Sequence, residues 1–137
     1  TLIGRSRKNR QLMSVTEITG KKSITNYKTL KVFNIKDVPK ISFLECKLET
    51  GRTHQIRVHM AYKGNSLLGD QQYGKKNLRF KKINEEFEDK LKVLSRQALH
   101  AKSLGFIHPT SKKLISFESK LPKDFKKILD LLNKLSH

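Results

Sequence analysis

The segment Leu48 to Met60, LETGRTHQIRVHM, concentrates the side chains of this sequence that could do chemistry. Its guanidinium, imidazole and amide groups belong to Arg52, His54, Gln55, Arg57 and His59. If a helix begins near Thr53, His54 and Arg57 are three positions apart and share a face. A guanidinium there can hold a carboxylate or a phosphate through two parallel hydrogen bonds, and the helix N-terminus adds positive charge. The spacing therefore predicts an anion site, with a solvated basic helix face as the alternative.

Other kinds of catalytic site find little support in the residue pattern. His54 and His59 are five positions apart and fall on different helix faces, and the sequence has no HExxH or CxxC motif. A Ser-His-Asp hydrolase is equally disfavoured, because there is no GxSxG sequence and Asp70 lies in a glycine-rich loop. The carboxylates between Glu85 and Asp89 are typical of a solvated helix face. We therefore predict no metal site.

The elements around this segment can be predicted from the spacing of apolar residues. Residues 23–33 and 41–49 alternate β-branched or aromatic residues with polar ones, which predicts two strands. Thr53 is the expected N-cap of a helix that runs to about Tyr62 and stops at Gly64. The opening residues have basic side chains but no sustained periodicity, and they predict no element.

The middle of the chain predicts a loop followed by a short helix. Residues 64–74 contain three glycines and are expected to form an ordered loop. Residues 75–82, KKNLRFKK, are expected to be a basic surface segment. Residues 85–94 place Phe87, Leu91 and Leu94 three or four positions apart, which predicts a short helix.

The C-terminal part predicts a hairpin and a closing helix. Residues 97–107 and 114–117 are expected to pair around a turn that contains Pro109. Pro122 opens a final helix, and its apolar face holds Phe125, Ile128, Leu129 and Leu132. With the earlier elements, this predicts one α+β domain over residues 1–137, with a mixed, mainly antiparallel sheet and packed helices.

The charge of the chain narrows the range of partners. Thirty Lys and Arg residues against twelve Asp and Glu residues leave a formal charge of +18, which favours a nucleic-acid partner. A generally basic set of proteins encoded by AT-rich DNA is the alternative. No apolar run is long enough for a membrane span and no cleavable signal pattern is present, so we expect a cytoplasmic protein. The lone Cys46 excludes an internal disulfide.

Five blocks of sequence in a fixed order carry a resemblance to a known family. The blocks are Leu48 to Met60, the pair Gly69-Asp70 with Tyr73-Gly74, RQALHA at 96–101, His108-Pro109, and LPKDF at 121–125. In this order they resemble the RluA family of pseudouridine synthases. GKKSITNYKTL, residues 20–30, resembles the family's segment just upstream. The similarity covers nearly the whole chain from about Gly20 to Phe125.

The resemblance implies an enzyme that isomerises uridine to pseudouridine in RNA without a cofactor, with large-subunit ribosomal RNA as the expected substrate. In the family an arginine pairs with the catalytic aspartate, and the motif position assigns this role to Arg57. A bidentate guanidinium keeps a carboxylate ionised and fixes its orientation. Arg52 is expected to contact phosphate or to close the strand-to-helix turn. His54 and Gln55 are expected to hold either substrate or local backbone groups.

The family's catalytic aspartate belongs to a segment resembling His-Arg-Leu-Asp, which does not occur in these 137 residues. The chain is therefore interpreted as the C-terminal portion of a catalytic domain, with the N-terminal half and its aspartate absent. On this interpretation Arg57 has no carboxylate partner within the chain, and the chain alone is inactive. Asp70 is expected to be a structural loop residue that caps backbone amides. A non-catalytic RNA-binding remnant of a split or truncated synthase is the alternative.

Overall fold

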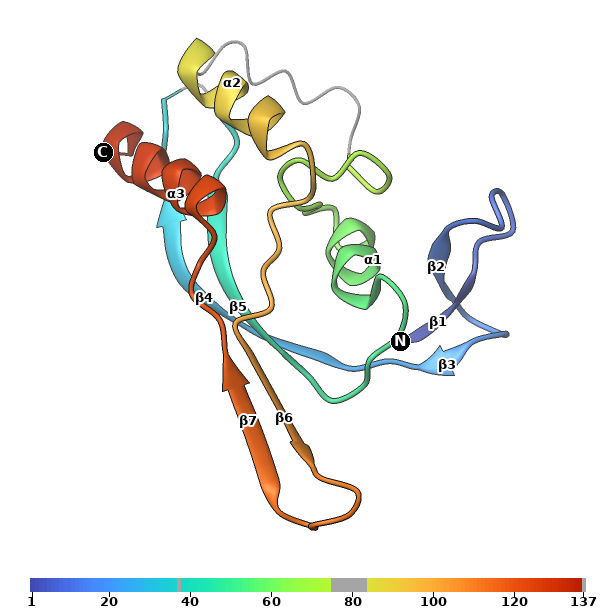
Figure 1. Ribbon diagram of the computed structural model, residues 1–137. Helices are drawn as coiled ribbons and strands as arrows, with labels where there is room; N and C mark the ends of the chain where they lie inside the picture. The colour runs from blue at the N-terminus through green and yellow to red at the C-terminus, as the bar shows by residue number, and fades with distance from the viewer. Residues whose placement is uncertain (37, 75–83, 137) are drawn as a thin grey trace.

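The computed structural model of the chain describes residues 1–36, 38–74 and 84–136 (Figure 1). The predicted basic segment at 75–82 lies outside these residues. The elements in chain order are β1 (Leu2–Arg5), β2 (Met13–Thr16), β3 (Lys21–Lys22), β4 (Thr25–Phe33), β5 (Ile41–Leu48), α1 (Gln55–Tyr62), α2 (Glu85–Leu94), β6 (Ser103–Ile107), β7 (Leu114–Glu118) and α3 (Lys123–Leu135).

The strands form three small sheets rather than one. Their orders are β2-β1-β3, β4-β5 and β6-β7, and every pairing among the described residues is antiparallel. The predicted α+β class with a mainly antiparallel sheet is confirmed. The parallel component implied by a mixed sheet does not appear in the described part of the chain. There β1–β2, β4–β5 and β6–β7 pair through short connections, and β1 also pairs with β3.

The β4–β5 ribbon is the longest pairing, and it connects the two ends of the molecule (Figure 1). Its register runs from Phe33 opposite Ile41 to Thr25 opposite Leu48, with an irregularity between Thr29 and Lys31. The alternation of β-branched and aromatic residues predicted both strands to within two residues of their observed ends.

The hydrophobic core lies where α2 and α3 pack over one end of this ribbon. Its buried members are Phe33, Phe87, Leu94, Ile128, Leu131 and Leu132. The predicted helix over residues 85–94 is confirmed, and the Asn84 side chain caps it by accepting the Glu86 amide hydrogen at 2.7 Å. The predicted face of α3 is correct except at one position. Leu129 is only half-buried, whereas Leu131, which was not predicted to face the core, is buried.

Two local predictions are wrong, and one hairpin was not predicted. The opening residues form the β1–β2 hairpin, whose strands are each four residues long and too short to show a period. Helix α1 is not capped by Thr53, because His54 takes the N-cap position with φ 56° and no side-chain cap. The strand expected from residue 97 begins only at Ser103. The backbone before Ser103 bonds instead to the loop that follows α1, because the Ala98 amide donates to the Leu68 carbonyl at 2.8 Å. None of the described helices is long and apolar enough to cross a membrane.

Candidate active site

A buried ion pair between Arg57 and Asp70 forms the centre of the candidate site. The Arg57 Nε donates to Asp70 Oδ2 and the Arg57 Nη2 donates to Asp70 Oδ1, both at 2.8 Å. The side chains are 9% and 0% exposed, respectively. Two parallel charge-assisted hydrogen bonds fix the plane of the guanidinium as well as its position. Arg57 is therefore held rigidly on the first turns of α1.

The loop after α1 brings Asp70 back onto this helix. Gly64 ends the helix with φ 82°, and Asn65 donates its amide hydrogen to the Met60 carbonyl at 2.9 Å, closing a Schellman-type turn. Gly69 has φ 72°, and an added Cβ there would collide with the carbonyl of Arg96. Only glycine fits at this position without strain. The Gly69-Asp70 pair in the sequence is thus a local requirement for placing the carboxylate.

The Asp70 carboxylate also organises the backbone of its own loop. Oδ1 accepts the amide hydrogens of Gln72 at 3.1 Å and Tyr73 at 3.0 Å. The expectation that Asp70 caps loop amides is confirmed. The expectation that Arg57 has no carboxylate partner in this chain is wrong, because the partner lies thirteen residues away across a loop. Helical spacing reports only neighbours three or four positions apart, so it could not reveal this contact.

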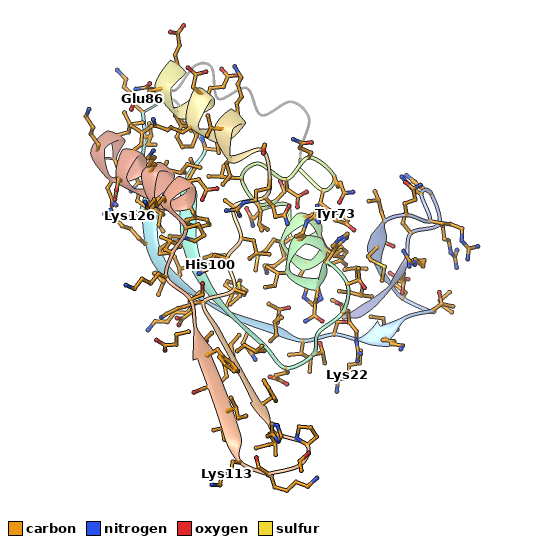
Figure 2. All side chains as sticks on the ribbon, viewed as in Figure 1. Lys22, Tyr73, Glu86, His100, Lys113 and Lys126 are labelled. Atoms are coloured by element: carbon orange, nitrogen blue, oxygen red, sulfur yellow. The ribbon has the colours of Figure 1, made fainter. Side chains whose placement is uncertain are left out.

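Tyr73 and Gln72 complete the surroundings of the guanidinium, although the sequence predicted no role for either. The Arg57 Nη2 donates a second bond to Gln72 Oε1 at 2.8 Å, and the Tyr73 ring lies 4.8 Å from the guanidinium carbon. The Tyr73 hydroxyl contacts His54 Nδ1 at 2.9 Å and accepts the Met13 amide hydrogen at 3.0 Å. Tyr73 therefore lies between α1 and the β1–β2 hairpin (Figure 2). The only sequence feature that pointed to Tyr73 was its place, with Gly74, in one of the five motif blocks.

One nitrogen of Arg57 remains open to a further ligand. Its Nε and Nη2 are committed to Asp70 and Gln72, whereas no hydrogen bond involves Nη1 among the described residues. In that part of the chain no buried side-chain nitrogen or oxygen lacks a partner, so Nη1 must be accessible to solvent. The guanidinium can accordingly offer a donor to a second anion while Asp70 keeps it in place.

Opposing effects set the protonation states in this cluster. Burial alone would raise the pKa of Asp70, but hydrogen bonds from Arg57 and from the Tyr73 and Gln72 amides outweigh it and lower the pKa below its usual value. The hydrogen bond to Asp70 raises the pKa of Arg57. The pair is therefore fully ionised at neutral pH.

Gln55 is buried beneath the turn that leads into α1. It is 2% exposed, and its Oε1 accepts the Thr50 hydroxyl at 2.8 Å and the Arg52 amide at 3.0 Å. Its Nε2 donates to the Ile24 carbonyl at 3.0 Å and to the Thr25 hydroxyl at 2.9 Å. All of its hydrogen-bonding capacity in this geometry is used inside the protein, which favours the positioning role over substrate contact.

Arg52 and the histidines have separate surroundings. The Arg52 Nε and Nη2 lie 3.4 and 3.3 Å from the Lys22 carbonyl, so the side chain closes the strand-to-helix turn while staying partly exposed. His59 contacts the Thr25 hydroxyl at 2.9 Å, on a different side of α1 from the His54 contact with Tyr73. The described residues include no group of three or more His, Cys, Asp or Glu side chains arranged to hold a metal ion.

His54 is expected to titrate below its ordinary pKa of about 6.5. Burial lowers its pKa and repulsion from Arg57 adds to the effect, so the fold disfavours the charged ring. The stability contributed by the neutral ring is complete above about pH 6.5 and is lost as the pH falls through the folded pKa. A ¹H-¹⁵N titration should show this pKa and a ring protonated on Nε2. Arg57→Gln should raise the pKa, and a wild-type value at or above the ordinary one would contradict the assignment.

Comparisons with known proteins agree with this geometry. The sequence model for "RNA pseudouridylate synthase" matches residues 3–62. Ribosomal large subunit pseudouridine synthase D of Zymomonas mobilis is 44% identical over 131 residues, which cover 95% of this chain and 38% of that protein. An uncharacterized RNA pseudouridine synthase of Chlorobaculum parvum is 40% identical over 136 residues, which cover 95% of this chain and 40% of that protein. The chain spans about two-fifths of the length of these curated relatives.

A solved structure supports the same class of fold. Human RNA pseudouridylate synthase domain containing 1 matches with a TM-score of 0.65 and 23% identity over 96% of this chain and 57% of that chain. The fold is thus that of a pseudouridylate synthase domain. The chain belongs to the RNA pseudouridylate synthase family, and its resemblance to the RluA type, inferred from five ordered blocks, is confirmed.

Proposed function

We propose that this chain supplies the arginine side of an active site that isomerises uridine to pseudouridine in RNA. The observation that carries the proposal is the state of Arg57, whose guanidinium is fixed by a buried carboxylate while its Nη1 forms no hydrogen bond with any described residue. Preorganised donors of this kind stabilise charge without reorganisation at the moment of reaction. Relatives named pseudouridine synthases support the reaction class.

The second anion is proposed to be the carboxylate of a catalytic aspartate outside these residues. The resemblance implies a reaction in which this aspartate acts on the nucleotide, the N-glycosidic bond breaks, the uracil turns and a carbon–carbon bond replaces the lost bond. The product is an isomer of the substrate, so the reaction has no net oxidation or group transfer, and the resemblance implies that it needs no cofactor. In this arrangement Arg57 keeps the aspartate ionised and oriented, and Asp70 keeps Arg57 from moving.

Residues 1–137 are proposed to be the C-terminal portion of such a catalytic domain. The support is that the chain spans 38% of a close relative and contains no His-Arg-Leu-Asp segment. The β6–β7 hairpin supports it independently. It projects from the body (Figure 1), and on one face it leaves Leu104, Phe106 and Phe117 exposed by 62%, 42% and 57%. An apolar face of this kind is expected to be covered by other polypeptide in the complete protein.

The proposed substrate is large-subunit ribosomal RNA. The name of the Zymomonas mobilis relative supports this choice, and the charge of +18 suits a structured RNA whose phosphates need many cationic contacts. The target uridine must leave its stack to reach Arg57, which costs less in a loop or a distorted helix than in a regular duplex. Such a substrate would place the protein in the cytoplasm.

The test is to incubate the full gene product with unmodified large-subunit ribosomal RNA and to map pseudouridines by carbodiimide labelling and primer extension. We expect one or a few modified positions with the full product and none with residues 1–137 alone, which lack the proposed aspartate. Product from residues 1–137 alone would show that the carboxylate is supplied within them. No product from the folded full protein would contradict the proposed reaction.

A further inference from the structure

The tip of the β1–β2 hairpin is an ordered turn with unusual charge. Residues 5–10 include Arg5, Arg7, Lys8 and Arg10, all exposed. None of these four side chains forms an ion pair with a carboxylate in the described part of the chain. The turn is nevertheless fixed by two backbone hydrogen bonds. The Ser6 amide donates to the Leu12 carbonyl and the Leu12 amide donates to the Asn9 carbonyl, each at 2.9 Å. Four uncompensated cations are therefore presented on a defined backbone.

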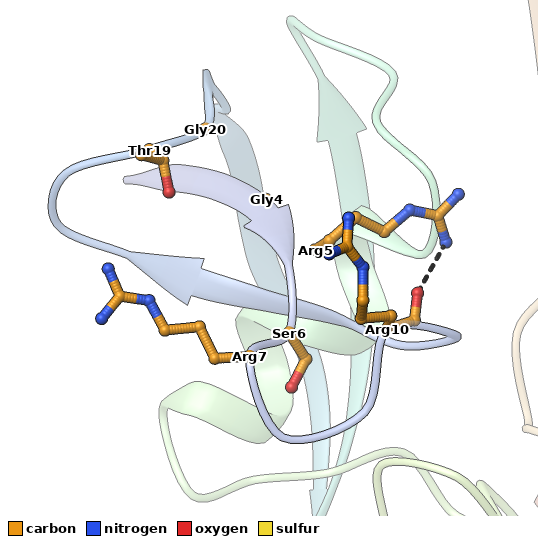
Figure 3. A pocket seen from close by; sticks show the side chains of 7 residues that line it. All are labelled: Gly4, Arg5, Ser6, Arg7, Arg10, Thr19 and Gly20. Atoms are coloured by element: carbon orange, nitrogen blue, oxygen red, sulfur yellow. Dashed lines mark hydrogen bonds between the residues drawn. The ribbon is translucent and has the colours of Figure 1, made fainter.

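Three of these cations, Arg5, Arg7 and Arg10, border a hollow of about 500 Å³ (Figure 3). The residues that line it are Gly4, Arg5, Ser6, Arg7, Arg10, Thr19 and Gly20. An added Cβ at Gly4 would come within 2.6 Å of the Thr19 carbonyl oxygen, and one at Gly20 within 2.8 Å of the Ile3 carbonyl. The two backbone segments can lie this close only because both positions are glycine.

The donors around the hollow suit a phosphodiester. The Arg5 Nη1 donates to the Arg10 carbonyl at 3.3 Å, so these two arginines lie beside each other while Arg7 extends on the other side of the strand (Figure 3). Guanidinium and hydroxyl groups are the usual side-chain donors to phosphate oxygens in nucleic-acid complexes. A backbone that follows the turn would thus meet cations on both of its sides.

The hairpin is also fastened to the elements that hold Arg57. The Met13 amide of β2 donates to the Tyr73 hydroxyl at 3.0 Å, and that hydroxyl contacts His54 at 2.9 Å. The Thr1 hydroxyl, just before β1, contacts His59 of α1 at 2.6 Å. Arg5 is near enough to repel the protonated form of His54. The basic turn is therefore fixed in position next to the candidate site.

We propose that the tip of the β1–β2 hairpin, residues 5–10, binds the phosphate backbone of RNA beside the nucleotide that is presented to Arg57. The binding itself rests on the arginines and the hollow, whereas the location of the target nucleotide rests on the proposed function. Contacts of this kind set the register and orientation of the RNA without reading its sequence.

The test compares two double variants of the full gene product that each remove two positive charges. Arg7→Gln/Arg10→Gln alters the tip, and Lys123→Gln/Lys127→Gln alters exposed lysines of α3 as a matched control. Among the described residues, the side chains of Arg7 and Arg10 form no hydrogen bond or ion pair within the turn, so both variants should fold. Arg5 is retained because its side chain bonds the Arg10 carbonyl.

The probe is a fluorescein-labelled RNA stem-loop, and its affinity is measured by anisotropy over a series of KCl concentrations. The tip variant should bind about tenfold more weakly at low salt, with the slope of log K against log[KCl] reduced by about 1.5, as expected for two lost phosphate contacts. The control should retain the wild-type affinity and slope. Equal losses in the two variants would mean that binding follows net charge alone, and this would overturn the proposal.

Two further measurements separate the outcomes. Where pseudouridine forms, the tip variant should need about tenfold more RNA for half-maximal rate and should reach the wild-type rate at saturation. If no pseudouridine forms but the two variants still differ in RNA affinity, the proposed reaction fails and the RNA contact stands. Vesicles of phosphatidylcholine and phosphatidylserine serve as a competing anionic surface. Loss of vesicle binding without loss of RNA binding in the tip variant would overturn the proposal.

Discussion

Asp70→Asn is expected to lower the free energy of unfolding by about 3–5 kcal/mol, the usual cost of removing one partner of a buried ion pair. The Asp70 side chain is 0% exposed and accepts two hydrogen bonds from Arg57 and two from backbone amides. An asparagine of the same shape would turn one N–H toward the guanidinium and would leave its charge without compensation. Urea unfolding of the full gene product, followed by circular dichroism, measures the loss.

A surface pair supplies the matched control for this variant. Lys126 and Asp130 lie 2.7 Å apart on α3 with side chains 64% and 58% exposed. Solvent screens such pairs, so Asp130→Asn should change the free energy of unfolding by less than about 0.5 kcal/mol. Similar losses for Asp70→Asn and Asp130→Asn would contradict a special role for the buried pair.

The pH dependence of the Asp70 effect has a definite sign. Hydrogen bonds lower the pKa of Asp70 in the folded state, so its stabilising effect is present above the unfolded value of about 3.9. It is lost as the pH falls through the folded pKa. The difference in stability between the wild type and Asp70→Asn should therefore be constant at neutral pH and should shrink below about pH 4.

Arg57→Lys is expected to reduce the turnover of the complete enzyme by about 10²-fold or more, the usual effect of removing a preorganised donor. An ammonium group is a point charge without the planar fork of a guanidinium. The lysine ammonium cannot bond both oxygens of Asp70 and at the same time donate to a second carboxylate, as Nη1 of Arg57 can. RNA affinity should change by less than about threefold, because we expect phosphate binding to be spread over many basic residues other than Arg57.

The informative comparison is between turnover and affinity, measured by single-turnover pseudouridine formation and by RNA anisotropy. Arg96→Lys is the control, since Arg96 also bonds both oxygens of a carboxylate at 3.2 and 3.0 Å, but its side chain is 38% exposed and contacts Asp124 of α3 instead of Asp70. It should leave turnover close to the wild-type value. Equal losses of turnover and affinity in Arg57→Lys would contradict the ion-pair role.

Much of the fold follows from local patterns in the sequence. The alternation along β4 and β5 and the apolar spacing in α2 and α3 predicted these elements nearly to the residue. Each of these strands and helices buries one side, so apolar and polar residues alternate along it with the period of that element. The ordered motif blocks similarly indicated the family and singled out Arg57 before any contact was known.

The contacts that define the site depend on tertiary structure. Asp70 reaches Arg57 only because the loop after α1 turns back at Gly64 and Gly69, and Tyr73 joins this loop to the hairpin through Met13. The β1–β2 hairpin shows no periodicity because its strands are so short, and three-dimensional packing alone sets its place beside α1. The sequence shows which functional side chains are present, whereas the turns of the folded chain determine which of them come into contact. For this protein, the motif resemblance in the sequence predicted that Arg57 binds a carboxylate, and the tertiary structure showed that Asp70 already holds it.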